Sequence, residues 1–283
     1  MEAIGPMSML LFATVLAAPF AAAGEREPFH WPDGQRAAVS LAYDDALDSQ
    51  LDHAIPALDR HGFKASFYLP LSADTLHTRL PEWRAAAASG HELGNHTLFH
   101  QCSGSGEGRD WVEPQRDLDT TTAAQMADQV RLANAMLGVI DGRSVRTLAV
   151  PCGDVMADGG NYVELIEQGF VAIRLGNGAV VEDMATLDPH AVSVDTPAEV
   201  TGAQLIAIVE EAARKGTMAS LTFHGVGGDY LAVSNEAHEA LLDYLASHRD
   251  VYWVAPFVEI MKYVRQQESI DDSAGHEDLK RVP

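Results

Sequence analysis

The sequence predicts one α/β domain whose parallel sheet closes into a barrel. Short apolar runs typical of buried strands alternate with helical patterns along most of the chain, which indicates β-α units with the helices outside the sheet. We count about seven or eight such units, and this number favours closure into a barrel. The length of 283 residues fits one large α/β domain or two small ones, and we predict one.

The first half of the chain begins with an apolar strand at residues 37–43, which is suited to burial on both faces. A helix follows that Pro56 must kink or restart and that Gly62 ends. A second strand at 64–69 and a helix at 82–89 lead into a histidine-rich stretch, which begins as a short strand and continues as a loop.

The second half repeats the alternation after a Gly-rich loop that starts at Ser103. Thr122, with Gln125 three residues later, forms a capping box and starts a helix that runs to Gly138. Strands are then predicted at 146–150, 170–175, 191–194, 219–223 and 251–254, and helices at 162–168, 202–215, 236–248 and 257–264.

Both ends of the chain read differently from the domain. The apolar run from Met9 to Ala18, followed by small residues up to Ala23, predicts a signal peptide over residues 1–23 that is too short to span a membrane. A disordered or buried N-terminal segment is the alternative. We expect the domain to occupy 24–268 and the polar tail at 269–283 to be disordered. The mature protein is then exported, periplasmic or extracellular, and free of the membrane.

The formal net charge of −22 limits the partners. Nucleic-acid binding needs clustered Lys and Arg, so it is excluded as the main function. Polyanionic substrates are disfavoured, although a local pocket can differ from the global charge. The acidity is most simply explained by solubility.

Three of the twelve histidines lie within residues 91–100. His96 and His100 stand four apart and can bind one ion if the backbone bends after Thr97. A catalytic zinc usually takes three protein ligands and keeps one position open for water. The adjacent carboxylates of Asp44 and Asp45 can supply the third ligand and leave one free as a base.

These groups share a position at or just beyond the carboxyl ends of predicted strands, where barrel active sites lie. The residues concerned are Asp44, Asp45, His96, Thr97, His100, Pro151, Gly153 and His224. Taken singly, an Asp-Asp pair is usually a solvated turn and a histidine after a strand is usually a core residue. The coincidence at four strand ends favours an active site.

Two stretches resemble the polysaccharide deacetylases, which share the NodB homology domain (carbohydrate esterase family 4). Residues 42–46, AYDDA, resemble the family's TFDDG motif, and residues 90–100, GHELGNHTLFH, resemble its GHEIGNHTxxH motif. The likeness extends from about Ala37 to Val264. It implies the deformed (β/α) barrel of that family.

The resemblance also implies the roles of the site residues. Asp45, His96 and His100 match the metal ligands, Asp44 matches the catalytic base, and residues 221–224, LTFH, match the LxLxH motif whose histidine, here His224, is the general acid. The implied cofactor is one divalent ion, with zinc first and cobalt, nickel or manganese as alternatives. Such an ion lowers the pKa of bound water and polarises an acetyl carbonyl. His91 is expected to be structural.

Two departures from the family put the substrate class in question. Ala149 stands where the family's RPPYG motif has the arginine that orients the base, and the DSxDW-like segment is replaced by residues 170–174. We predict that Arg174 points inward over the strand ends and pairs with Asp44, because a buried carboxylate base needs such a partner. The alternative is that Arg174 faces outward and forms a salt bridge with a helix.

The predicted substrate-binding residues are Pro151, Gly153, Leu221, Trp111 and Tyr230. For the apolar acetyl pocket we consider Leu221 and Tyr230 together with Val226 and Trp253, each of which could equally be plain core. Trp111 and Tyr230 lie in Gly-rich loops, where an exposed aromatic ring either stacks on a sugar or pins its own loop.

Cys102 and Cys152 are the only cysteines, and each follows an active-site motif. In an oxidising compartment this placement favours a disulfide between the two loops. Two free thiols near the site are the alternative.

The predicted function is a metal-dependent hydrolase that removes acetyl groups from an oligo- or polysaccharide. N-deacetylation of a chitin-like or other amino-sugar substrate comes first, and O-deacetylation of acetylated xylan or another glycan second. Another amide or cyclic-amide hydrolase and a non-catalytic carbohydrate-binding protein are the remaining alternatives.

Overall fold

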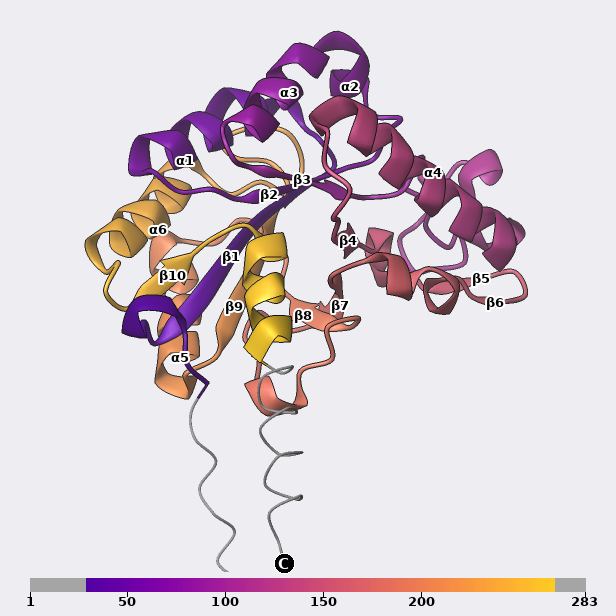
Figure 1. Cartoon of the computed structure of the whole chain (residues 1–283). Coiled ribbons are helices and arrows are strands. Elements are labelled where there is room, and N and C mark those ends of the chain that lie inside the picture. The colour runs from indigo at the N-terminus through magenta and orange to yellow at the C-terminus, as the bar shows by residue number, and fades with distance from the viewer. Residues whose placement is uncertain (1–28, 268–283) are drawn as a thin grey trace, which may run out of the picture.

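The computed structural model describes residues 29–267 (Figure 1). The predicted signal peptide at 1–23 and the predicted tail at 269–283 lie outside these residues. Between them, no helix is long and apolar enough to cross a lipid bilayer.

Seven parallel strands form a nearly closed ring. Their bounds are β1 (Ala37–Asp44), β2 (Ser66–Leu69), β3 (Glu92–Asn95), β4 (Leu148–Ala149), β7 (Ile173–Asn177), β8 (Val192–Val194) and β9 (Met218–Phe223). They pair in the order β1-β2-β3-β4-β7-β8, and β9 pairs with β1. Asp195, just after β8, pairs with Leu221 of β9 and so brings the two ends of the ring together. The predicted α/β barrel is therefore confirmed.

An eighth strand, β10 (Tyr252–Val254), pairs in parallel with the first residues of β1, Ala37 to Val39. The last residues of β1 pair instead with β2. This change of neighbour along one strand is a deformation that a regular eight-unit barrel does not have.

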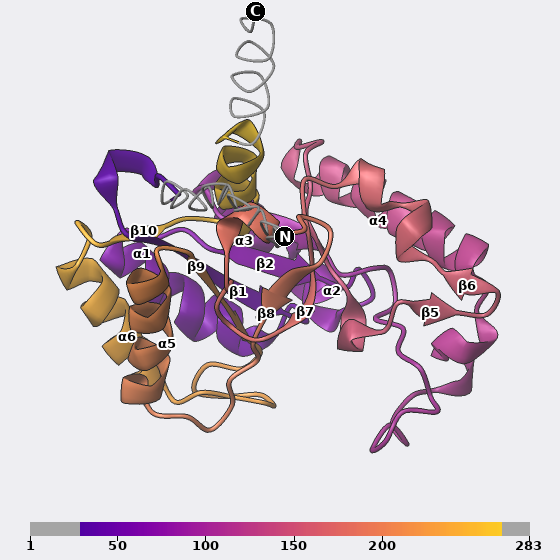
Figure 2. The same cartoon turned by 90° about the horizontal axis from the view of Figure 1, so that it is seen from below.

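Helices cover the outside of the ring, as Figures 1 and 2 show. Their bounds are α1 (Ile55–His61), α2 (Asp74–Thr78), α3 (Leu80–Ala88), α4 (Ala123–Asp141), α5 (Gly202–Lys215) and α6 (Asn235–Ser247), followed by a helix at 257–267. Along β1, Val39, Leu41 and Tyr43 pack in the core with residues of α1, α5 and α6, whereas Ala38 and Ala42 pack with Tyr68 in a second cluster. This alternation follows from the period of two in a strand.

Local sequence signals explain several helix ends. The predicted capping box of Thr122 and Gln125 is present at the start of α4, and Thr201 forms a second one at the start of α5. Gly62 ends α1 in the left-handed conformation with φ 67°. The helix expected after the first strand is divided near Pro56, as predicted. Residues 50–54 form a π-helical turn, and α1 then begins at Ile55.

The structure corrects some predicted elements. The helix expected at 162–168 is two short 3-10 segments, Val163–Leu165 and Glu167–Gly169. The strand expected at 146–150 is reduced to β4, since Pro151 has no N–H for a ladder and the chain turns there into a 3-10 segment. The short helix α2 and a hairpin, β5 (Met156–Ala157) with β6 (Gly160–Asn161), were not predicted.

The interior of the barrel is unusually polar. The buried carboxylate of Glu92 accepts hydrogen bonds from the hydroxyls of Ser66 and Thr147, both at 2.5 Å, and from the N–H of Val258 at 3.0 Å. The Thr147 hydroxyl also hydrogen-bonds the Tyr68 hydroxyl at 2.8 Å. Burial raises the pKa of Glu92. This network fixes the ring of Tyr68, which lies beneath the guanidinium of Arg174.

An aromatic cluster lies at the end of the barrel where β1 begins. The Trp31 ring lies 4.5 Å from Phe29, 6.1 Å from Trp253 and 6.2 Å from Tyr263, measured between ring centroids. The Tyr263 hydroxyl donates to the carbonyl oxygen of His30 at 2.7 Å. The first described residues and the helix at 257–267 are therefore joined side by side at this end.

Candidate active site

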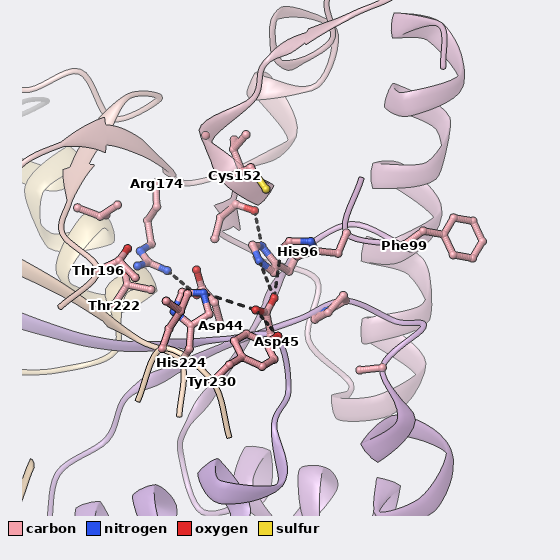
Figure 3. A pocket seen from close by; sticks show the side chains of 18 of the residues that line it. Asp44, Asp45, His96, Phe99, Cys152, Arg174, Thr196, Thr222, His224 and Tyr230 are labelled. Atoms are coloured by element: carbon pink, nitrogen blue, oxygen red, sulfur yellow. Dashed lines mark hydrogen bonds and ion pairs between the residues drawn. The ribbon is translucent and has the colours of Figure 1, made fainter. Parts of the chain in front are cut away.

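A cavity of about 990 Å³ opens at the carboxyl ends of the strands (Figure 3). It is lined by residues at or just after the carboxyl ends of β1, β2, β3, β4, β8 and β9 and by residues of β7. Six of the eight predicted strand-end groups line this cavity, and they are Asp44, Asp45, His96, His100, Gly153 and His224.

The two carboxylates reach the cavity because β1 ends in a sharp turn. Asp45 has φ 79° and Ala46 has φ 55°, so both adopt the left-handed conformation that non-glycine residues rarely take. The Asp45 N–H still bonds the carbonyl oxygen of Tyr68 at 3.1 Å. Backbone strain of this kind is often found at functional sites.

The histidine stretch bends where the metal hypothesis required. Thr97 and His100 have φ values of 67° and 51°. The Asn95 side-chain oxygen accepts from the Thr97 N–H at 2.7 Å, and the Thr97 hydroxyl oxygen accepts from the His100 N–H at 3.0 Å. The turn brings the rings of His96 and His100 to 4.8 Å between centroids.

Asp45, His96 and His100 fit a divalent cation. The Nε2 atoms of His96 and His100 lie 3.4 Å and 3.2 Å from Asp45 Oδ1, which is buried and has no hydrogen-bond partner among residues 29–267. Nδ1 of His96 is 2.8 Å from the carbonyl oxygen of Ala149, and donation there leaves the Nε2 lone pair facing Asp45. One carboxylate and two imidazoles are a ligand set typical of catalytic zinc.

The pKa shifts of two members of this trio, Asp45 and His100, are compatible with cation binding. Burial opposes the ionisation of Asp45, but the adjacent imidazoles of His96, His100 and His224 hold the Asp45 pKa well below its ordinary value. Burial and the neighbouring His96 lower the pKa of His100 to about 4, so its imidazole is neutral at pH 7. A metal ligand must be in that state.

Arg174 points inward, as the sequence predicted. Its Nη1 donates to Asp44 Oδ1 at 3.0 Å, and its guanidinium carbon lies 4.5 Å from the centre of the Tyr68 ring. The residue is only 2% exposed. The alternative in which Arg174 faces a helix is wrong, since β7 directs this side chain toward the cavity.

His224 and Tyr230 approach Asp45 from the other side (Figure 3). Nε2 of His224 is 3.5 Å from Asp45 Oδ2, and the Tyr230 hydroxyl donates to the same oxygen at 2.8 Å. Burial and the Asp45 carboxylate raise the pKa of the Tyr230 hydroxyl, so it stays protonated. No local sequence pattern indicates this hydrogen bond.

Gln50 is a second residue that the sequence did not reveal. Its side-chain amide donates to the carbonyl oxygens of Asp44 at 2.5 Å and His224 at 3.1 Å. It therefore ties together the ends of β1 and β9 on which the site is built. An isolated Gln after an acidic turn has no sequence signature that could have identified it.

Cys102 and Cys152 form a disulfide, with their Cα atoms 5.9 Å apart. The bond joins the loop after His100 to the turn after β4, and Cys102 Sγ lies 3.7 Å from Nδ1 of His100. The predicted pairing is thus present. His91, expected to be structural, is fully buried and hydrogen-bonds the Ala65 N–H at 3.2 Å.

Of the predicted substrate-binding residues, Gly153, Trp111 and Tyr230 line the cavity. Trp111 is 57% exposed and Tyr230 is 53% exposed. Pro151 is buried beside the cavity and does not line it.

Leu221 is also a correction, because it is fully buried in the core between the ring and the helices. Thr222 lines the cavity instead, and the period of two along β9, which places Thr222 on the face of His224, could have identified it. Val226 is buried in the same core as Leu221, and Trp253 packs against Trp31 in the aromatic cluster at the opposite end. Other lining residues that the sequence did not single out are Phe99, Arg116, Asn177 and Thr196.

Comparison with known proteins identifies the class. Residues 32–167 match the family model described as polysaccharide deacetylase. This segment contains Asp44, Asp45, His96 and His100. The resemblance found in the sequence is therefore confirmed as a match to a polysaccharide deacetylase domain over residues 32–167.

Solved structures share the fold. A protein of Mycobacterium smegmatis assigned as a polysaccharide deacetylase is 16% identical with a TM-score of 0.55, and the match covers 86% of this chain and 95% of that one. The peptidoglycan deacetylase PdaC of Bacillus subtilis is 14% identical with a TM-score of 0.55, and the match covers 87% and 99%. At these identities the likeness establishes the architecture.

A gellan lyase of a Bacillus species is similar in sequence, at 25% identity over 288 residues. The match covers 92% of this chain but only 10% of the lyase, so the chain spans about a tenth of that protein's length.

Proposed function

We propose that the protein is a metal-dependent hydrolase that removes acetyl groups from a carbohydrate, with an N-acetylated amino sugar as the first candidate substrate. The observation that carries the proposal is the buried Oδ1 of Asp45. It accepts no hydrogen bond from residues 29–267 and faces Nε2 of two histidines, while Asp44 is held beside it by Arg174.

Asp45, His96 and His100 would hold one divalent ion, which when bound makes water acidic and polarises an acyl carbonyl. Asp44 is not needed as a ligand, because its Oδ1 is engaged by Arg174. It is therefore available as the general base that removes a proton from the attacking water. The hydrogen bond from the guanidinium fixes the direction of the carboxylate.

His224 is proposed as the general acid that protonates the departing nitrogen. It lies on the other side of Asp45 from His96 and also lines the cavity. Base and acid are thus contributed by β1 and β9, which are adjacent in the sheet. The backbone carbonyl oxygens of Asp44 and His224 both accept hydrogen bonds from the side-chain amide of Gln50. The protein thus holds the backbones that carry the proposed base and acid at a fixed distance.

The shape of the cavity supports a sugar substrate. The half-exposed rings of Trp111 and Tyr230 line it from two loops, and exposed aromatic rings stack on sugar faces. A volume of about 990 Å³ exceeds what an acetyl group alone would occupy.

The test measures acetate release and metal content together. The panel contains N-acetylated chitooligosaccharides, peptidoglycan fragments, acetylated xylan and acetylated gellan. We expect about one bound divalent ion per chain, release of acetate from an N-acetylated member, loss of activity on chelation and recovery on metal addition. His100→Ala should lose most of the metal. Full metal occupancy in that variant would refute the ligand assignment, and release only from O-acetylated members would reassign the substrate.

We also propose that the protein is exported, with residues 1–23 as a signal peptide and the domain beginning at Gly24. The disulfide between Cys102 and Cys152 supports this, since such bonds persist in oxidising compartments. N-terminal sequencing of protein recovered from outside the cytoplasm should begin at Gly24. Recovery of the chain only from the cytoplasm would contradict the proposal.

A further inference from the structure

The two oxygens of the Asp45 carboxylate lie in different environments. Oδ1 faces the imidazoles of His96 and His100 and accepts no hydrogen bond from residues 29–267. Oδ2 accepts the hydroxyl of Tyr230 at 2.8 Å. Figure 3 shows Tyr230 pointing to Asp45 from the side opposite His96. One oxygen is therefore left for an ion while the protein holds the other.

The loop that carries Tyr230 is fixed independently of this hydrogen bond. The Gly225 N–H donates to the carbonyl oxygen of Tyr230 at 3.1 Å, and the Val233 N–H donates to that of Gly225 at 3.0 Å. The Asp229 carboxylate accepts from the Ser49 N–H at 2.8 Å. The phenol is thus presented to Asp45 by an anchored loop.

We propose that Tyr230 is a positioning residue that holds Asp45 as a one-oxygen ligand of the metal ion. The inference rests on the metal site of the proposed function. A carboxylate on a free side chain can rotate and offer either oxygen or both. A hydrogen bond to Oδ2 removes that freedom and directs the Oδ1 lone pair toward the two imidazoles. Outer hydrogen-bond partners of metal ligands typically change metal affinity by about 10- to 100-fold.

Tyr230 also contributes to the wall of the cavity, because the residue is 53% exposed and lines it. The hydroxyl and the ring therefore have separable roles, one toward the ligand and one toward the substrate. Tyr230→Phe removes the first and keeps the second. Since the ring is half exposed, the change leaves the hydrophobic core intact.

The experiment compares metal affinity in three variants, measured as the Kd for Zn²⁺ by competition with a chromogenic chelator. Tyr230→Phe is expected to bind Zn²⁺ about 10- to 100-fold more weakly than the wild type. Tyr244→Phe is the matched control, because its hydroxyl also donates to a carboxylate, Glu210 at 3.1 Å, on an exposed helix face. Leu231→Ala tests the loop, since Leu231 also lines the cavity but cannot bond Asp45. Both controls should keep the wild-type Kd, and the Tm of metal-free Tyr230→Phe should match that of the wild type.

Each other outcome overturns the inference in a recognisable way. An unchanged Kd in Tyr230→Phe refutes it and leaves the proposed function standing. An equal loss of affinity in Leu231→Ala assigns the effect to the loop and removes the role of the hydroxyl. A wild-type protein that binds no Zn²⁺ removes the metal site and the inference together.

Discussion

At the scale of single residues, Arg174 holds Asp44 by a hydrogen bond that the sequence predicted. Ala149 occupies the motif position where the family has its arginine, and Arg174 reaches the same carboxylate from the neighbouring strand β7. The Tyr68 ring beneath the guanidinium adds a cation-π contact and is itself fixed through Thr147 and Glu92.

Arg174→Lys tests this arrangement. Lysine keeps the charge but loses the planar donors that reach Asp44 while lying over Tyr68. We expect kcat to fall on the order of 100-fold through misplacement of the base. Metal content and Tm should remain close to the wild type. Steady-state kinetics beside metal analysis checks this, and unchanged kcat would exclude Arg174 from positioning the base.

Asp44→Asn tests whether Asp44 acts as the base and not as a metal ligand. The amide cannot accept a proton from water, so kcat should fall by about 10²- to 10⁴-fold. Metal content should be retained, since Asp45 and the two histidines remain. Asp45→Asn is the matched comparison and should lose the metal. If both variants lost metal equally, the assignment of different roles to the two carboxylates would fail.

At the scale of elements, the disulfide joins the two loops that carry ligand and wall residues. It closes a span of 50 residues that includes all of α4. We expect the Cys102→Ser/Cys152→Ser double variant to lose about 2–4 kcal/mol of unfolding free energy, because the unfolded chain gains freedom. Denaturant unfolding measures this. Thiol titration of the unreduced, denatured wild type should detect no free thiol, and two reactive thiols per chain would show that the bond is absent in the protein.

Much of the secondary structure could be predicted from the sequence, because helix caps and hydrophobic periodicity are local signals. Helix α5 begins and ends where its pattern predicted, at Gly202 and Lys215, and Thr122 caps α4 as expected. The weak points are elements held by tertiary contacts. Residues 162–168 have helical spacing, but they make two 3-10 turns, in which Tyr162, Val163 and Ile166 pack in a buried cluster with residues of α4.

Site residues could be predicted from the sequence where a motif lies at the end of a strand. They were harder to predict where the direction of a side chain determines whether it reaches the cavity. Asp44, Asp45, His96, His100 and His224 converge as expected, because parallel strands end on one face. The apolar character of Leu221 predicts a pocket residue, but the period of two along β9 directs Leu221 into the core and Thr222 into the cavity. The hydrogen bonds of Gln50 and Tyr230 depend on how distant loops fold back, and no local pattern encodes them.

At the scale of the whole molecule, a buried histidine links stability to pH. His238 of α6 is fully buried, and its Nε2 hydrogen-bonds the Tyr43 hydroxyl at 2.6 Å. Burial, with the positive charges of His61 and Arg60, lowers its pKa to about 3. In the unfolded chain a histidine has a pKa of about 6.5. Between these values the unfolded state binds the extra proton, so acid favours unfolding.

The expected result is a loss of unfolding free energy as the pH falls from about 6.5 toward 3, contributed by His238 at up to about 1.4 kcal/mol per pH unit. His238→Gln should have a shallower acid slope, although its stability at pH 7 is lower. His77→Gln, at an exposed position, is the control and should keep the wild-type slope. Chemical denaturation at pH 4.5 and pH 7 measures both. An unchanged slope in His238→Gln would assign acid sensitivity to other groups.

The aromatic cluster of Phe29, Trp31, Trp253 and Tyr263 has a practical consequence for engineering. It holds both described ends together at the start of β1, whereas the cavity opens beyond Asp44, about 25 Å further along the strand. A tether to a solid support or a fused binding module at either end would therefore leave the cavity facing solution. Because the Tyr263 hydroxyl bonds His30, a short linker could also join the two ends and permit circular permutation, with the chain reopened in a surface loop remote from the disulfide.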